Sequence, residues 1–181
     1  QSEVMQPPTP LMSKVAARAG TSSAGAPSNE STSGVSHSYR SHDGTPLSKG
    51  YHMPAEWARH DATWLSWPKN PLTFPEEVID EVEGVFAQMA AALSDGELVR
   101  ILVDDQALED RAYAKVAGEG ADMSRVRFMR IRSADVWIRD YGPSFLLHRD
   151  TGSKAAVKWD FNAWGAKYDD LLYDDIAGQH V

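Results

Sequence analysis

The chain is organised around one polar and aromatic stretch, Asp135-Val136-Trp137-Ile138-Arg139-Asp140-Tyr141-Gly142-Pro143. It combines two carboxylates, a guanidinium, an indole and a Gly-Pro turn, a mixture that folding alone does not require. An indole face attracts a flat cation, and a carboxylate can accept two N–H bonds from a guanidinium. Trp137 and Asp140 share a side if the chain makes a tight helical turn, which Gly142-Pro143 favours. We therefore predict that Trp137 and Asp140 bind a cation of the guanidinium type.

A purely structural interpretation of the same stretch stays open. Asp commonly hydrogen-bonds its own backbone in turns, so Asp140 would cap a turn ahead of Gly142-Pro143. Trp137 would then belong to the core, and Arg139 would pair with a distant acid. Residue chemistry alone does not decide between the two interpretations.

Composition narrows the classes of partner. At 181 residues and 42% hydrophobic, the chain can bury one domain-sized core, and it has no apolar run long enough to span a membrane. A net charge of −8 disfavours nucleic acids and anionic membranes as partners. The absence of cysteine excludes disulfides and thiolate metal sites, and the six histidines lack metal-ligand spacing. We expect a protein without metal or cofactor.

The chain divides near residue 51. Residues 1–50 are rich in Ser, Gly and Pro and poor in large apolar residues, which predicts a disordered low-complexity tail. A targeting role for this tail stays open, although it has neither a hydrophobic core segment nor many arginines. Residues 51–181 are expected to form the folded domain.

Hydrophobic periodicity predicts an α/β domain. Strands are expected at 62–67, 97–103 and 126–131, with a hairpin made by 144–148 and 154–161. Thr73, Pro75 and Glu76 form a helix-start signature, and this first helix should end near residue 95. A second helix should end at Gly118, and 169–181 should begin a third. The site stretch therefore lies in a loop between strands.

Other polar and aromatic residues in this domain are interpreted as structural. Asp104 and Asp105 are expected to cap the second helix or stabilise its dipole. Trp57, Trp64 and Trp67 are expected in the core. His60 and Glu56 are expected to hydrogen-bond those indoles, with a ligand-facing role left open.

Three motifs in this chain resemble one family. Asp135–Pro143 is similar to the W-x-R-D-x-G-P motif of the agmatine deiminase and bacterial-type peptidylarginine deiminase family. The segment from Met53 to Pro68 resembles the family's M-P-A-E-W-x-x-H-x-x-x-W-x-x-W-P opening. The segment from Phe161 to Tyr168 resembles its F-N-x-W-G-x-K-Y segment, with Ala166 where Gly is usual.

The resemblance implies a fold and a set of roles. The expected fold is a five-bladed β/α propeller, or pentein, of which this chain would supply about two ββαβ units as the N-terminal part. The resemblance assigns Asp140 to gripping the guanidinium and Trp137 to lining its face, with Arg139 and Asp135 in support. The catalytic Cys and His of the family match no residue here, so no catalytic residue is expected in this chain.

The implied activity is hydrolysis of agmatine to N-carbamoylputrescine and ammonia, as part of putrescine biosynthesis. The implied partner is a small guanidine substrate, the implied location is the cytoplasm, and a homo-oligomer is compatible with the sequence. Two alternatives stay open. One is a peptidylarginine deiminase of the same family, and the other is an inactive guanidine-binding or scaffold protein.

Overall fold

The computed structural model describes residues 44–181, which fall into two units. The first comprises 57–143 and 158–181, and the second comprises 44–56 and 144–157. Most of the predicted tail, residues 1–43, lies outside the described residues. Residues 44–50 are described and include a short 3-10 turn, η1 (Leu47–Lys49).

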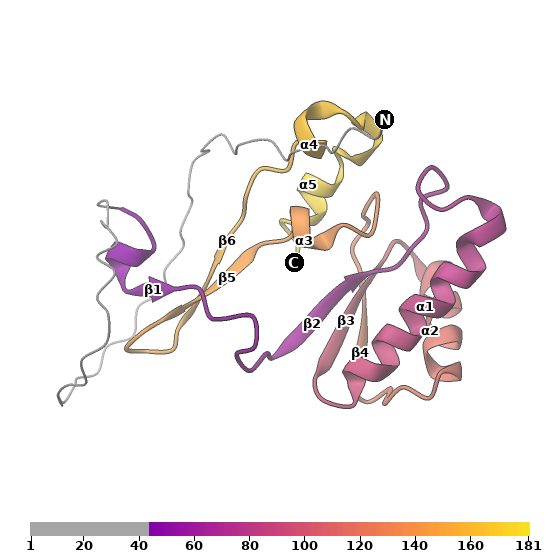
Figure 1. Ribbon diagram of the computed structural model, residues 1–181, viewed down its shortest axis with the longest axis horizontal. Helices are drawn as coiled ribbons and strands as arrows, with labels where there is room; N and C mark the ends of the chain where they lie inside the picture. Colours follow the sequence, from indigo (N-terminus) through magenta and orange to yellow (C-terminus); the bar gives the residue numbers. More distant parts are fainter. Residues whose placement is uncertain (1–43) are drawn as a thin grey trace, which may run out of the picture. The chain divides into compact units, whose positions relative to one another are not determined.

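The first unit is built on a parallel sheet of β2 (Ala62–Ser66), β3 (Leu98–Val103) and β4 (Val126–Arg130), in that order. Ala62 lies opposite Leu98, and Val99 lies opposite Val126. Two helices make the crossovers between strands, α1 (Glu76–Ser94) and α2 (Gln106–Gly118), and they lie together beside the sheet in Figure 1. This strand-helix alternation confirms the predicted α/β class.

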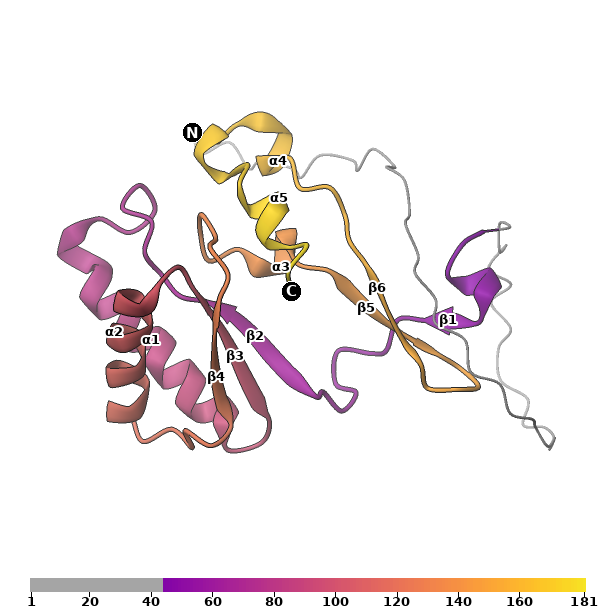
Figure 2. The same ribbon diagram turned by 180° about the vertical axis from the view of Figure 1, so that it is seen from behind.

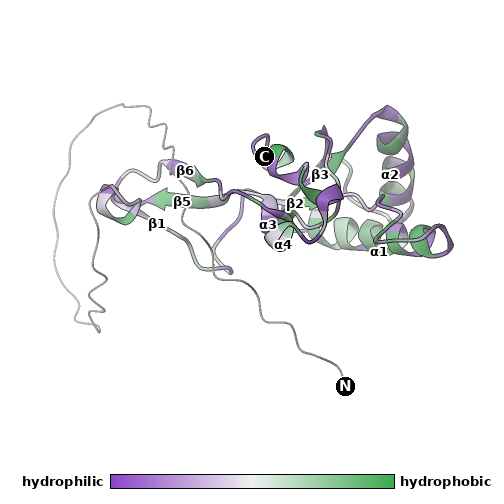
Figure 3. Cartoon of the chain, turned by 90° about the horizontal axis from the view of Figure 1, so that it is seen from above, coloured by the Kyte–Doolittle hydropathy of each residue, from purple (hydrophilic) through white to green (hydrophobic). Residues whose placement is uncertain are grey.

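The main core lies between this sheet and its two helices. Both helices carry hydrophilic and hydrophobic residues along their lengths, as expected for elements that bury one face (Figure 3). The buried apolar residues are Leu65, Trp67, Ala87, Ala90, Val99, Ile101, Val103, Ala112, Val116 and Val126. Every one of the three strands and both helices contributes to this core, which keeps the strand ends in fixed positions.

The helix boundaries agree with the sequence, but two predicted caps are wrong. Asp105 does cap α2, because its side chain accepts a hydrogen bond of 2.9 Å from the Leu108 N–H. Asp104 instead accepts bonds from Lys69 and from the Ser133 N–H. Thr73 makes no cap to α1, because its hydroxyl donates to the carboxylate of Asp135. In both cases a tertiary partner competes with the local one.

The tryptophan cluster is only partly a core. Trp67 is fully buried, and its Nε1 donates to Glu83 Oε1 at 2.8 Å. Trp64 lies under the Arg100 guanidinium, 5.0 Å from ring centroid to Cζ, whereas Trp57 is 90% exposed. His60 lies 3.3 Å from Glu97 through its Nδ1. This contact of His60 is with an acid and not with one of the indoles.

A second apolar cluster packs the sheet against α3 (Ile138–Tyr141) and against the C-terminal segment, whose helix α5 (Asp174–Ala177) lies next to α3 in Figure 2. Its buried members are Leu102, Tyr141 and Ala177. The C-terminal segment, like the single turn of α3 (Ile138–Tyr141), consists of short pieces, namely α4 (Ala163–Ala166), η2 (Asp169–Leu171) and α5 (Asp174–Ala177). The predicted continuous helix from 169 is therefore wrong, since single turns of this length are stable only when tertiary contacts hold them.

The second unit is an antiparallel sheet of β1 (Tyr51–His52), β5 (Ser144–His148) and β6 (Lys154–Val157). The predicted hairpin is confirmed, with Ser144 opposite Val157. Its second strand ends at Val157 and not at 161, because Lys158 and the Phe161 N–H both bind Asp175 in the first unit. The two-residue β1 is too short to produce a periodic signal in the sequence.

Among the helices of residues 44–181, none is both long and apolar enough to cross a membrane.

Candidate functional site

Polar residues gather at the carboxyl edge of the parallel sheet. The three strands run in the same direction, so the residues at their carboxyl ends meet at one edge of the sheet. These are Ser66 at the end of β2, Asp104 directly after β3, and the 133–135 loop after β4. Ligands of open α/β sheets commonly bind at this edge. A cavity of about 370 Å³ opens there, and its lining includes Lys69 and Arg132.

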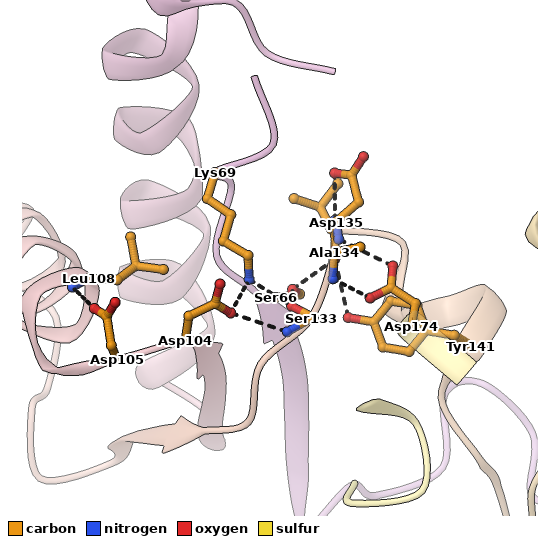
Figure 4. A network of polar contacts seen from close by, with 11 residues as sticks. Ser66, Lys69, Asp104, Asp105, Leu108, Ser133, Ala134, Asp135, Tyr141 and Asp174 are labelled. Carbon is orange, nitrogen blue, oxygen red and sulfur yellow. Dashed lines mark hydrogen bonds and ion pairs between the residues drawn. The ribbon is translucent and has the colours of Figure 1, made fainter. Parts of the chain in front are cut away.

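Lys69 connects the ends of the three strands (Figure 4). Its Nζ lies 2.5 Å from Asp104 Oδ1 and 2.9 Å from Ser133 Oγ. The Ser133 N–H donates to the same Asp104 oxygen at 3.1 Å, and the Ser133 and Ser66 hydroxyls are 2.9 Å apart. Asp104 is thus part of a network that binds the strand ends together.

Asp135 is the fully buried centre of this region. Its Oδ2 accepts hydrogen bonds from the Thr73 hydroxyl and, at 3.2 Å, from Asn70 Nδ2. Its Oδ1 accepts the Val136 N–H at 2.7 Å. A buried carboxylate is tolerated when its lone pairs are satisfied in this way. The loop after β2 therefore holds the side chain of Asp135 through the hydrogen bonds from Asn70 and Thr73.

The backbone of Asp135 is held as firmly as its side chain. Its carbonyl accepts hydrogen bonds from Ser66 Oγ at 2.9 Å and from the Tyr141 hydroxyl at 3.2 Å. Its N–H donates to Asp174 Oδ2 at 3.1 Å. The structure thus places Asp135, predicted as a supporting residue, inside the protein as an anchor of the motif loop.

Asp174 is a second fully buried carboxylate, and it also receives the Ala134 N–H (Figure 4). Burial raises the pKa of Asp174 to about 6, against the opposing effects of its two backbone hydrogen bonds and of the Lys69 charge. Burial likewise raises the pKa of the Tyr141 phenol. The two hydrogen-bonded N–H groups and the buried position make Asp174 part of the same anchor.

Trp137 and Asp140 lie on the turn that this anchor holds. The Asp140 N–H donates to the Trp137 carbonyl at 2.9 Å, so the predicted tight turn, α3, is confirmed. Trp137 is 42% exposed, which shows that its predicted alternative as a core residue is wrong. Arg139 and Asp140 are exposed on the same turn.

The carboxylate of Asp140 differs from its two buried neighbours. Asp140 does not cap α3, whose N-terminus has no side-chain cap. Within residues 44–181, no hydrogen bond or ion pair to this carboxylate is present. An exposed carboxylate without an internal partner, three residues from an exposed indole, is free to receive a cationic ligand.

An aromatic cluster backs this turn. The Trp137 and Trp164 rings meet edge to face with centroids 5.9 Å apart. Trp164 also meets Phe161 at 5.4 Å and Tyr168 at 5.9 Å in the same geometry, which aromatic quadrupoles favour. The sequence singled out the segment from Phe161 to Tyr168 through its resemblance to a family motif, but it did not predict that this segment contacts Trp137.

Trp164 sits in a left-handed turn. The φ angles of Ala163, Trp164, Gly165 and Ala166 are 50°, 54°, 84° and 57°. Asn162 supports the turn, because its carbonyl accepts the Ala166 N–H at 2.7 Å and its side chain accepts the Gly165 N–H at 2.9 Å. Left-handed residues other than Gly are strained, and such strain clusters at functional sites.

Replacing Ala166 by Gly is expected to stabilise the protein by about 1 kcal/mol, because Gly adopts this positive φ without a Cβ clash. Urea unfolding measures the change. The matched control is Ala114→Gly, an exposed position inside α2, which should lose about 1 kcal/mol since the backbone there is right-handed. A less stable Ala166→Gly protein would show that the strain is compensated elsewhere.

No cluster of three or more His, Asp and Glu residues that could hold a metal ion occurs among residues 44–181.

Comparison with known proteins identifies relatives of this chain. The model of the Porphyromonas-type peptidyl-arginine deiminase family matches residues 52–181. The agmatine deiminase of Stutzerimonas stutzeri is 39% identical over 132 residues, covering 72% of this chain and 33% of the relative. That of Ectopseudomonas mendocina is 36% identical over 129 residues, covering 71% and 33%. The chain spans about a third of the length of these curated relatives.

Solved structures agree in fold. An X-ray structure of a candidate agmatine deiminase has a TM-score of 0.64 and 29% identity, covering 75% of this chain and 37% of that one. A Cys-to-Ser variant of the C. jejuni agmatine deiminase with substrate bound has a TM-score of 0.58, covering 71% and 35%. At 21% identity, this second likeness concerns the fold alone.

Proposed function

Because the chain belongs to the Porphyromonas-type peptidyl-arginine deiminase family, we propose that it carries the guanidinium-binding part of an agmatine deiminase. The observation that carries the proposal is the pair of exposed side chains at the α3 turn, Trp137 and Asp140, of which the Asp140 carboxylate has no partner within residues 44–181. Curated agmatine deiminases at 36–39% identity support the substrate class. The proposed location is the cytoplasm, and the proposed pathway is putrescine synthesis.

The proposed role of each residue follows from the chemistry of a guanidine. A guanidinium carbon is stabilised by resonance, so hydrolysis to a urea and ammonia calls for a nucleophile and for groups that hold the cation in place. Asp140 accepts N–H bonds from the guanidinium, and Trp137 covers its face. Arg139 and the buried Asp135 support this turn. The nucleophile must come from outside this sequence, which contains no cysteine.

We also propose that the two described units are parts of a five-bladed β/α propeller, or pentein. The supporting observation is the likeness in fold to solved deiminases with TM-scores of 0.57 to 0.64.

Two alternative functions have their own support. The family to which the chain belongs is described as a peptidyl-arginine deiminase family, which favours a peptidylarginine deiminase. The missing thiol favours an inactive guanidine-binding protein. The higher identity to curated agmatine deiminases makes agmatine the preferred substrate.

The direct test is an assay of the protein translated from the complete gene. We expect it to release ammonia and N-carbamoylputrescine from agmatine, while the 181-residue chain alone releases neither. Ammonia from a peptidylarginine substrate but not from agmatine would favour the first alternative. Release of no ammonia from either substrate would favour the second. Turnover by the 181-residue chain alone would contradict the proposed origin of the nucleophile.

A further inference from the structure

Asp174 has no part in the proposed chemistry, yet it is a fully buried acid that contacts the motif loop. It lies in α5, about forty residues after the loop, and its carboxylate receives the N–H groups of Ala134 and Asp135. We propose that Asp174 is a positioning residue, which holds the 134–141 loop so that Trp137 points toward the cation, without touching the cation itself. The identity of the cation rests on the proposed function, whereas the positioning of the 134–141 loop by Asp174 does not.

Asp174 is itself fixed against the loop that it holds. Ala177, one turn later in α5, is buried against Tyr141 and Leu102. At Gly178 a Cβ would come within 2.0 Å of the Tyr141 carbonyl oxygen, so the two backbones are packed too closely for any other residue. The helix end therefore cannot slide along the loop, and the Asp174 carboxylate is held at a constant position.

The path from Asp174 to the indole is short and hydrogen-bonded throughout. Asp135 receives the Val136 N–H on its own carboxylate at 2.7 Å, and the Val136 carbonyl accepts the Ile138 N–H at 2.8 Å. Trp137 lies between these two bonds, and it is two residues after Asp135, whose N–H binds Asp174. A rotation of the peptide between Ala134 and Asp135 would therefore change the direction of the Trp137 side chain.

The charge state of Asp174 gives a second way to test this clamp, by which we mean the two hydrogen bonds that the Asp174 carboxylate accepts from the Ala134 and Asp135 N–H groups. Three charged or titratable groups face Asp174. The charge of Lys69 lowers the pKa of Asp174 and the charge of Asp135 raises it, while the charge of Asp174 itself raises the pKa of Tyr141. Burial raises the pKa of Asp174 to about 6. A protonated carboxyl has one strong acceptor oxygen fewer, so the clamp should weaken as the pH falls through 6.

The first experiment compares ligand-free proteins by two-dimensional ¹H–¹⁵N NMR. Asp174→Asn places an NH₂ group against one of the two N–H donors, and we expect the Ala134 and Asp135 amides and the Trp137 indole N–H to shift. The Trp67 indole N–H, buried on the other face of the sheet, should stay unchanged. The control is Asp170→Asn, an exposed acid in the cavity lining. A Trp137 indole signal that stays in place in a folded Asp174→Asn protein would overturn the proposal.

The second experiment uses agmatine as the probe. Asp174→Asn should weaken agmatine binding about threefold to tenfold, and the unmodified chain should lose affinity as the pH falls through 6 while the variant does not. If Asp174→Asn bound agmatine with the same affinity and the same pH dependence as the unmodified chain, the proposal would be overturned. If the unmodified chain binds no agmatine but its indole signal moves in the variant, the proposed function fails and the positioning role stands.

Should Asp174→Asn not fold, a pH titration of the unmodified chain decides the matter. The Ala134 and Asp135 amides and the Trp137 indole should then titrate with one common midpoint near 6. An indole signal that is flat across the titration of the two amides would overturn the proposal.

Discussion

Asp135→Ala is expected to lower the free energy of unfolding by about 3–5 kcal/mol, because it removes a fully buried carboxylate that accepts three hydrogen bonds. The Thr73 hydroxyl, the Asn70 amide and the Val136 N–H would be left without their acceptor. A buried donor without a partner costs about 1–3 kcal/mol. Urea unfolding at pH 7 measures the loss as a shift of the midpoint.

The matched control is Asp105→Ala, which removes an acid of the same type from the loop between β3 and α2. Asp105 makes a single N-cap bond to Leu108, so its loss should cost only about 1 kcal/mol. Equal losses in the two variants would mean that the anchoring network around Asp135 does not carry the stability assigned to it.

Asp140→Asn is expected to weaken agmatine binding about tenfold to a hundredfold. The change keeps the shape of the side chain but removes the charge, and a hydrogen bond to a charged group contributes about 1.5–3 kcal/mol. Unlike Asp135, Asp140 is exposed and has no bond to lose within residues 44–181, so the stability of the chain should stay within about 0.5 kcal/mol. Calorimetric titration with agmatine measures the affinity, and urea unfolding checks the stability.

The control for this variant is Asp150→Asn, an exposed acid in the β5–β6 turn that carries the same change of charge. If both variants lose affinity equally, the effect comes from the overall charge of the protein. If Asp140→Asn loses stability but not affinity, the turn-capping interpretation of Asp140 replaces the binding one.

Local patterns predicted the strands and helices because each has a clear period. α1 and α2 follow helical spacing up to Gly or Asp stops, and β3 is mainly apolar, broken only by Arg100, with Ile101, Leu102 and Val103 fully buried. The pieces after residue 158 could not be predicted, since the left-handed turn at Ala163 and the single turn of α5 exist through contacts with distant residues.

The same limit applies to the site. The chemistry of Trp137 and Asp140 is local to one turn, so the sequence was enough to select both, and their binding role stays a prediction. The roles of Thr73, Asp104 and Asp174 depend on partners 29 to 62 residues away. Each of these residues has a plausible local function as a cap or a helix end, and no pattern in a single sequence reveals that a tertiary hydrogen bond replaces it.

The binding role of Trp137 and Asp140 is tested most directly by an NMR titration of the chain with agmatine and with putrescine, which has an amine where agmatine has a guanidine. A site built from Trp137 and Asp140 should select the flat, forked cation. We expect that agmatine shifts the Trp137 indole N–H signal in a saturable way, that putrescine at the same concentration does not, and that Asp140→Asn abolishes the difference. Equal shifts with both ligands, or a selective shift that survives Asp140→Asn, would show that Trp137 and Asp140 do not form a guanidinium site.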